Sequence, residues 1–109
     1  MTALAALQIE QAVGEVIKLT DVPPDGATAL IPKLLNSDPE NKISIFIADH
    51  EVVGGVHLGD LVEGSYRHNI KKEHLLHYLG PDRVFRYIIY DYAGNEDHSQ
   101  IVKYTIKHS

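Results

Sequence analysis

The fold is decided by the stretch Val84-Phe85-Arg86-Tyr87-Ile88-Ile89-Tyr90-Asp91-Tyr92-Ala93-Gly94-Asn95, which lies inside the longer run from Asp82 to Lys107. Apolar and aromatic residues are almost continuous from Val84 to Tyr90, and this density is typical of a buried β-strand. The residues from Ala93 to Asp97 predict a turn. Val102, Tyr104 and Ile106 then alternate with polar residues in a further strand. The run therefore predicts two paired core strands joined by a tight turn.

Each residue type in this run has a predicted structural role. Phe85, Tyr87 and Ile89 are expected to face the interior, because successive strand residues point to opposite faces. We expect the Tyr87 hydroxyl to find a backbone partner, as buried tyrosines usually do. The turn is expected to have Asp91 and Asn95 bonded to its amides and Gly94 at a positive φ. The remaining strand residues are expected to face outward or an edge: Val84, Arg86, Ile88 and Tyr90.

Working outward from this run, the sequence predicts further short strands. The clearest is 42–49, where Ile43, Ile45 and Ile47 alternate with other residues. Gly54-Gly55 predicts a bulge or turn within the strand 51–57. Pro32 interrupts an apolar segment and points to an edge strand or one that switches sheets. The other predicted strands are 14–19, 27–35 and 61–70.

Two segments depart from this strand pattern. Residues 69–79 predict one short helix of about three turns, with Asn69 as its cap, helical spacing of its leucines, and a stop at Gly80-Pro81. Residues 1–12 are rich in alanine and leucine, and we expect them to be a flexible leader. The predicted fold is all-β, a β-sandwich of about seven strands with one short helix, in a single domain over 13–109.

The run from Val84 to Asn95, followed by Ser99 and the strand 102–106, resembles the end of bacterial immunoglobulin-like repeats. Those repeats end in a pattern close to V-x-Y-x-V-x-D-x-A-G-N, a serine and a final alternating strand. Phe85 stands for the first apolar residue, and Tyr87, Ile89 and Asp91 hold the next three positions. The resemblance covers residues 14–107, with its specific part in 82–107. It implies an immunoglobulin-like antiparallel sandwich that serves as a spacer or recognition module of a bacterial surface or secreted protein.

This chain departs from many members of that family in having no tryptophan in the strand that begins the core. Phe46 or Ile45 must then fill the corresponding space.

Composition excludes several classes of function. The chain has 109 residues, no cysteine and a formal net charge of −5. The missing cysteines exclude a disulfide scaffold, a thiol nucleophile and a thiolate zinc site. Nucleic acid and anionic membranes are poor partners for an acidic chain with scattered basic residues. The N-terminus has no basic region typical of a secretory signal, so we expect a cytoplasmic protein or a part of a longer exported chain.

Histidines and carboxylates suggest three kinds of site, each with a simpler alternative. His74 and His77, with His68 and Glu73 nearby, fit one face of a helix that could bind a metal, but no metal motif is present and solvated histidines are favoured. Calcium at Asp91, Asn95 and Asp97 suits oxygen ligands, yet the spacing is not that of a calcium loop. Carboxylate pairs such as Asp60 with Glu63, or Asp91 with Asp97, are the third kind and could serve glycoside cleavage. In a chain with 15 acidic residues, such pairs are expected by chance. We predict no catalytic residue, no cofactor and no enzyme.

Tyrosines provide the best candidate for a binding surface: Tyr66, Tyr78, Tyr90 and Tyr92. Exposed tyrosines can stack on sugars or anchor a protein partner, although pairing across strands also explains them. The first hypothesis is a non-catalytic module that binds a protein or a glycan. The second is a free-standing small protein, such as a toxin, an inhibitor or a self-associating protein, that acts through a sheet edge or a tyrosine face.

Overall fold

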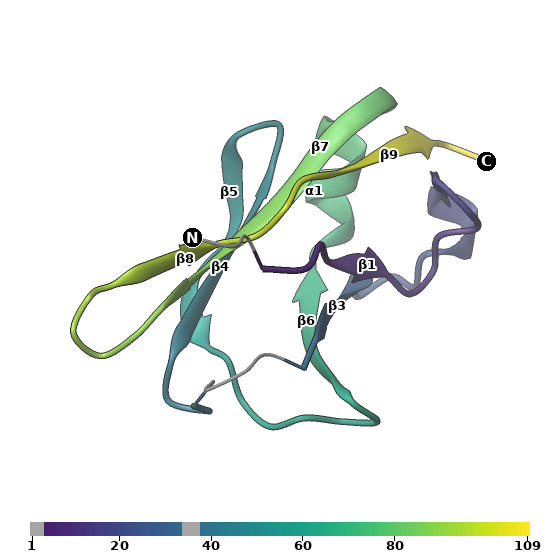
Figure 1. Ribbon diagram of the computed structural model, residues 1–109. Coiled ribbons are helices and arrows are strands. Elements are labelled where there is room, and N and C mark those ends of the chain that lie inside the picture. The colour runs from purple at the N-terminus through teal and green to yellow at the C-terminus, as the bar shows by residue number, and fades with distance from the viewer. Residues whose placement is uncertain (1–3, 34–37) are drawn as a thin grey trace.

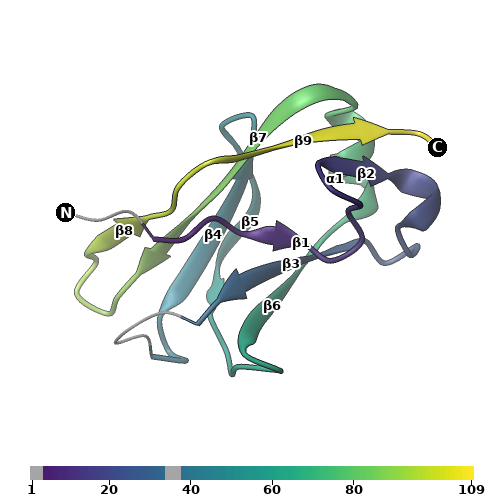
Figure 2. The same cartoon turned by 45° about the vertical axis from the view of Figure 1, so that its right-hand side comes forward.

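The computed structural model describes residues 4–33 and 38–109, which fold into two β-sheets packed face to face with one short α-helix. Figure 1 and Figure 2 show β1 (Gln8–Ile9), β3 (Ala27–Pro32) and β6 (Ser65–Ile70) on one side, and β4 (Lys42–Ile47), β5 (His50–His57), β7 (Gly80–Tyr90) and β9 (Val102–Lys107) on the other. The predicted all-β sandwich with one short helix is confirmed. Nine strand segments replace the seven expected, and the two additional ones are the short strands β1 and β8.

The smaller sheet has the order β1-β3-β6 and is antiparallel. Its strands are β1 (Gln8–Ile9), β3 (Ala27–Pro32) and β6 (Ser65–Ile70). Pro32 was expected to mark an edge or a switch between sheets, and that prediction is wrong because β3 is the central strand. The strand tolerates Pro32 because this residue is its last, beyond the two residues that β1 pairs with. Leu34 and Leu35, predicted at the end of this strand, lie outside the described residues.

The larger sheet has the order β2-β9-β7-β4-β5, and β8 also pairs with β7. All its pairs are antiparallel except β2 with β9, which is parallel. Its strands are β2 (Val16–Lys18), β4 (Lys42–Ile47), β5 (His50–His57), β7 (Gly80–Tyr90), β8 (Glu96–His98) and β9 (Val102–Lys107). The expected bulge in β5 is present, since the register against β4 shifts at two places and Gly55 has a φ of 57°.

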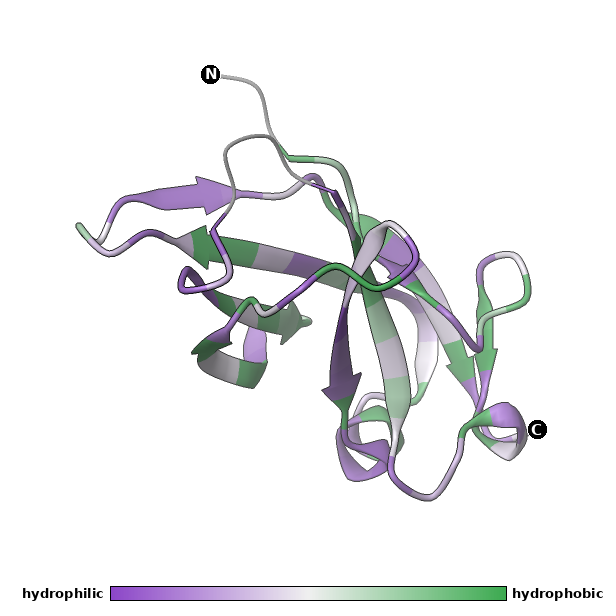
Figure 3. Ribbon diagram, turned by 90° about the horizontal axis from the view of Figure 1, so that it is seen from below, coloured by the Kyte–Doolittle hydropathy of each residue, from purple (hydrophilic) through white to green (hydrophobic). Residues whose placement is uncertain are grey.

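The core lies between the sheets, and apolar residues alternate with polar ones along the strands (Figure 3). As predicted, Phe85, Tyr87 and Ile89 of β7 face it and are buried. Ile88 was expected to face outward or an edge, yet it is only 6 % exposed. The main contributors from other elements are Ile31, Tyr66 and Ile70 of the smaller sheet, Ile43, Ile45 and Ile47 of β4, and Tyr104 and Ile106 of β9.

The helix α1 (Lys72–His77) is shorter than predicted. It begins three residues after Asn69, whose side chain does not cap it but donates a hydrogen bond to the Asp25 carbonyl at 2.7 Å. The predicted helix over 69–79 was too long because Asn69 and Ile70 belong to β6 and Gly80 already belongs to β7. The helix buries Leu75 and packs against the 3-10 turn η1 (Leu19–Asp21). Among the described residues no helix has the length and hydropathy to cross a membrane.

The N-terminal segment 4–12 is part of the sandwich, so the prediction of a flexible leader is wrong for these residues. Leu7 and Ile9 are 1 % and 4 % exposed. Leu4 pairs with Ser99 beside the larger sheet, and β1 then pairs with β3 in the smaller sheet. Only around β1 does the segment alternate like a strand, with Leu7 and Ile9 buried on either side of exposed Gln8. Met1 to Ala3, also in the predicted leader, lie outside the described residues.

Two core tyrosines hold this bridge in place. The Tyr87 hydroxyl donates to the Ala5 carbonyl, which is the backbone partner that the sequence predicted. The Ile9 N–H donates to the Tyr104 hydroxyl at 3.2 Å. Burial raises the pKa of Tyr87 to about 12, so the hydroxyl remains a donor at any physiological pH. Two tyrosines of the run from Asp82 to Lys107 therefore bind the N-terminal segment to the core.

Candidate functional site

The turn between β7 and β8 is organised around one carboxylate. Asp91 Oδ1 accepts hydrogen bonds from the backbone N–H groups of Ala93 and Asn95, both at 2.9 Å. Asp91 Oδ2 accepts from Asn95 Nδ2 at 3.0 Å. The side-chain and backbone hydrogen bonds from Asn95 are the main reason that the pKa of Asp91 is lowered. Gly94 has a φ of 85°, as predicted, so the turn is ordered by local contacts alone.

This turn carries Tyr92 at the tip of a hairpin that projects away from the end where the chain finishes (Figure 1). Tyr92 is 101 % exposed, and every residue from Ala93 to His98 is exposed as well. Tyr90 lies just below it, half-buried and paired with Lys42 and Glu96 on the neighbouring strands. A large, stiff side chain on an ordered turn can bind with little loss of conformational entropy. Tyr92 and Tyr90 are therefore grouped as one candidate for a binding surface, called the turn tip below.

The other two predicted surface tyrosines do not join the turn tip. Tyr78 follows α1 at the opposite end of β7, about 30 Å away by the rise of an extended strand. It is half-buried, and its ring stacks on His50 at 5.6 Å and meets His77 edge-on at 4.8 Å. The four tyrosines therefore do not form one face.

The prediction that Tyr66 is exposed is wrong, because this residue is 4 % exposed. It pairs with Ile31 and points to the core with Ile70. The weak periodicity of residues 61–70 hid the start of β6 at Ser65, and the start of the strand decides which alternate residues face inward.

The histidines and acidic residues considered for metals do not come together. Among residues 4–33 and 38–109, no three histidine, aspartate or glutamate side chains form a group able to hold a metal ion. The Asp91 carboxylate already binds the amides of its own turn. His68 lies apart from α1, with Nε2 3.0 Å from the Leu58 carbonyl, and its pKa is lowered because it is partly buried.

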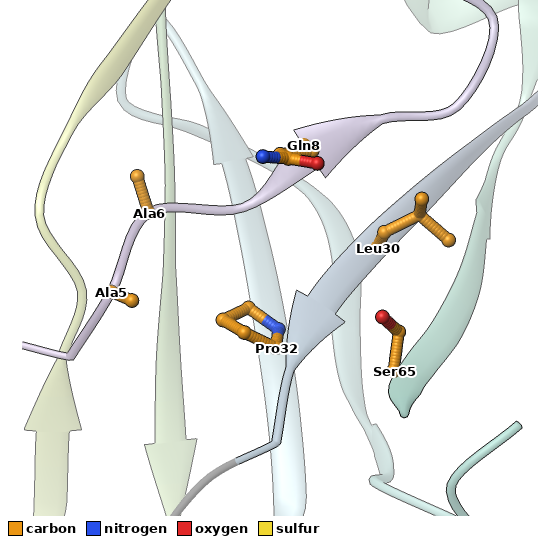
Figure 4. A pocket seen from close by; sticks show the side chains of 6 residues that line it. All are labelled: Ala5, Ala6, Gln8, Leu30, Pro32 and Ser65. Carbon is orange, nitrogen blue, oxygen red and sulfur yellow. The ribbon is translucent and has the colours of Figure 1, made fainter. Parts of the chain in front are cut away.

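A shallow hollow lies on the outer side of the smaller sheet, beside the N-terminal segment (Figure 4). Its volume is about 210 Å³, below the usual range of small-molecule sites. The only polar side chains in it are those of Gln8 and Ser65, and neither titrates. Sequence reasoning missed this hollow because it depends on the packing of residues 4–9, which were expected to be loose. Its lining is Ala5, Ala6, Gln8, Leu30, Pro32 and Ser65.

The chain was compared with protein families, with curated proteins and with solved structures. No protein-family model, no curated protein and no solved structure matches the chain.

Proposed function

We propose that this chain is an immunoglobulin-like module that carries out no chemistry itself and recognises a protein or a glycan partner through the turn tip. The observation that carries the proposal is the fully exposed Tyr92 on a turn ordered by Asp91. Tyrosine is enriched where binding energy concentrates, and an ordered turn lowers the entropic cost of binding.

The strand order supports the immunoglobulin-like assignment. Constant-type immunoglobulin domains place strands A, B, E and D in one sheet and C, F and G in the other. In this chain β1, β3 and β6 match A, B and E, while β4, β7 and β9 match C, F and G with β5 as an added edge strand; among the described residues no strand matches D. The family resemblance of residues 82–107 depends on residue types and the topology depends on strand pairing, and both favour the same family.

Tyr87, Asp91 and His68, whose pKa values are shifted, each have a structural partner. Tyr87 holds the N-terminal segment, Asp91 orders the turn and His68 meets the Leu58 carbonyl. Catalytic sites depend on perturbed groups gathered in a cleft, and these three lie on separate parts of the fold. This distribution favours recognition over catalysis.

A glycan array tests the sugar arm of the proposal. We expect the chain to bind a defined subset of glycans, and Tyr92→Ala to reduce that binding about tenfold because stacking area is lost. Ile101→Ala is the matched control, since Ile101 is 56 % exposed in the break between β8 and β9. An array with no signal, or equal loss in both variants, overturns the sugar arm.

Site-specific photo-crosslinking tests the protein arm. A photoreactive phenylalanine analogue replaces Tyr92 in cells that produce the chain, and the same analogue replaces Ile101 as the control. We expect one discrete adduct from position 92 that an excess of the unlabelled chain suppresses and an excess of the Tyr92→Ala variant does not. Equal suppression by both competitors contradicts recognition through the turn tip.

A further inference from the structure

The outer edge of β5 is the most open strand edge in the described part of the chain. β5 ends the larger sheet and, within residues 4–33 and 38–109, pairs with β4 alone. It has eight residues, whereas β2 at the opposite edge has three. Natural edge strands are often guarded by lysine or proline, and β5 contains neither. An edge of this kind can accept another strand.

The register against β4 assigns the side chains of β5 to two faces. Glu51 pairs with Phe46 and His57 pairs with Lys42, so both belong to the outer face of the sheet. Val56 pairs with the fully buried Ile43 and lies on the core side, where Val52 also packs. Val56 is nevertheless 41 % exposed. The edge thus has an acid and a base on one face and three valines on the other, because Val53 also packs on the core side opposite Ile45.

We propose that β5 pairs with β5 of a second copy of this chain, antiparallel, about a two-fold axis through Gly54. In this register the outer-face Glu51 lies opposite His57 of the second copy, and the core-side Val52 lies opposite Val56 of the second copy. Each contact occurs twice because of the symmetry. A shift by one residue places outer-face residues opposite core-side ones and loses both matches. The match of the Glu51 carboxylate with the His57 ring of the second copy, together with the matched faces, therefore selects a second copy as the occupant.

The side chains near the axis are already placed for this contact. The Glu51 carboxylate lies over Gly54, where an added Cβ would be 2.5 Å from Oε1. His57 Nδ1 is 3.2 Å from the Glu40 carbonyl, so Nε2 is the ring nitrogen that can reach a carboxylate of the second copy. Among the described residues Glu51 has no ion pair within its own chain.

The two bulges of β5 are the main feature that opposes pairing, because bulges bend edge strands away from partners. Gly54 and Gly55 reduce this effect. Without side chains, their backbones can approach a neighbouring strand closely. The axis passes through the first of these glycines, where the two copies come closest.

Sedimentation equilibrium of the whole chain tests the dimer from micromolar to millimolar concentration. We expect a concentration-dependent dimer, and Val56→Lys to weaken it about tenfold, since lysine on an edge disfavours pairing. Val13→Lys is the matched control, because Val13 is 73 % exposed and lies outside β5. A wild-type chain that stays monomeric throughout, or a Val56→Lys variant that dimerises as strongly as wild type, overturns the proposal.

Charge reversal tests the register. Glu51→Lys replaces the carboxylate acceptor opposite His57 Nε2 by an ammonium group, which can only donate, and is expected to weaken the dimer about tenfold. The double variant Glu51→Lys/His57→Glu restores opposite charges and is expected to recover the wild-type dissociation constant. If the double variant stays as weak as the single one, the register through Gly54 is wrong.

A cysteine at the axis gives a second readout that does not depend on charge. The chain has no cysteine, so Gly54→Cys introduces a single thiol. Directly opposed strand residues are close enough for a disulfide. We expect oxidation to link Gly54→Cys chains faster than Val13→Cys chains, and equal rates contradict the proposal. Tyr92→Ala is expected to leave dimerisation unchanged, which separates this inference from recognition by the turn tip.

Discussion

Strands β7 and β5 lie on opposite sides of the same strand, β4, yet their environments differ completely. β7 is paired along both edges, with β4 on one side and with β8 and β9 on the other. Its residues Phe85 and Tyr87 are fully buried. β5 is paired along one edge, and none of its eight residues is buried. Both segments have strand-like sequences, so position in the sheet and not local propensity decides what each contributes to stability.

The difference also determines how backbone groups are satisfied. Where the strand next to β7 breaks between β8 and β9, Ser99 accepts the Tyr87 N–H through its hydroxyl at 2.9 Å. The Ser99 N–H donates to the Tyr87 carbonyl at 3.0 Å. On β5, the N–H of Gly55 donates to the Ser44 hydroxyl at 3.0 Å; Ser44 is buried but Gly55 is exposed, so this contact is only partly buried and water can reach the Gly55 N–H. An interior strand needs protein partners, whereas an edge strand can use solvent.

The largest expected effect comes from removing a buried aromatic ring from β7. Phe85→Ala is expected to lower the free energy of unfolding by about 3–5 kcal/mol, because it empties a buried site that contacts Tyr104 edge-on. Val56→Ala in β5 is expected to change it by less than about 0.5 kcal/mol. Urea denaturation measures both. Similar losses in the two variants contradict the division into an interior and an edge strand.

The next test asks whether the N-terminal segment belongs with the interior strand or with the exposed edge. Leu7→Ala is expected to lower the free energy of unfolding by about 2–4 kcal/mol, because Leu7 is 1 % exposed in the core. Ala5→Gly is the control, since Ala5 is exposed and takes part through its carbonyl. If urea denaturation shows a loss below about 0.5 kcal/mol for Leu7→Ala, residues 4–12 do not contribute to the core and the flexible-leader interpretation is correct after all.

Two serines provide a matched test of the backbone contacts. Ser99→Ala leaves the N–H of buried Tyr87 without its acceptor, and we expect a loss of about 1–2 kcal/mol. Ser44→Ala removes the acceptor of exposed Gly55, and we expect a loss below about 0.5 kcal/mol. The two variants are compared by urea denaturation under one condition. Equal losses show that the exposure of the donor does not matter.

The smallest expected effect is a pH dependence of stability. It arises where the segment after β5 contacts β6 of the smaller sheet. His68 on β6 faces the Leu58 carbonyl just after β5, and burial lowers its pKa below the ordinary 6.5. The unfolded chain therefore binds this proton more readily, so stability falls as pH drops from about 7 through 6.5 toward the lowered pKa. When the melting temperature is plotted against pH over this range, we expect a shallower slope for His68→Gln than for the wild-type chain. An unchanged slope contradicts the role of His68.

The sequence predicted the β7 region well because its signals are local. Continuous β-branched and aromatic residues define a buried strand, and the Asp91, Gly94 and Asn95 pattern defines the turn. The alternation at Ile43, Ile45 and Ile47 likewise predicted β4 and its buried face.

Other predictions failed where long-range contacts decide. Residues 4–12 lack a strong local pattern, and they become ordered through Tyr87 and Tyr104, which lie far along the chain. The prediction of an exposed Tyr66 failed because the face on which Tyr66 lies depends on where β6 starts, and the weak periodicity of residues 61–70 does not show that start. Asn69 was taken for a helix cap, but its side chain bonds to Asp25 across the fold.

By itself, the sequence determined an all-β chain with one short helix and an ordered turn that carries Tyr92, since these follow from residue patterns a few positions apart. Only the tertiary structure decided that β5 is an edge, that the N-terminal segment bridges both sheets, and that Tyr66 and Tyr78 lie apart from the turn tip. The physical reason is that pairing partners and burial depend on contacts between residues far apart in the chain, and local patterns do not encode which strands become neighbours.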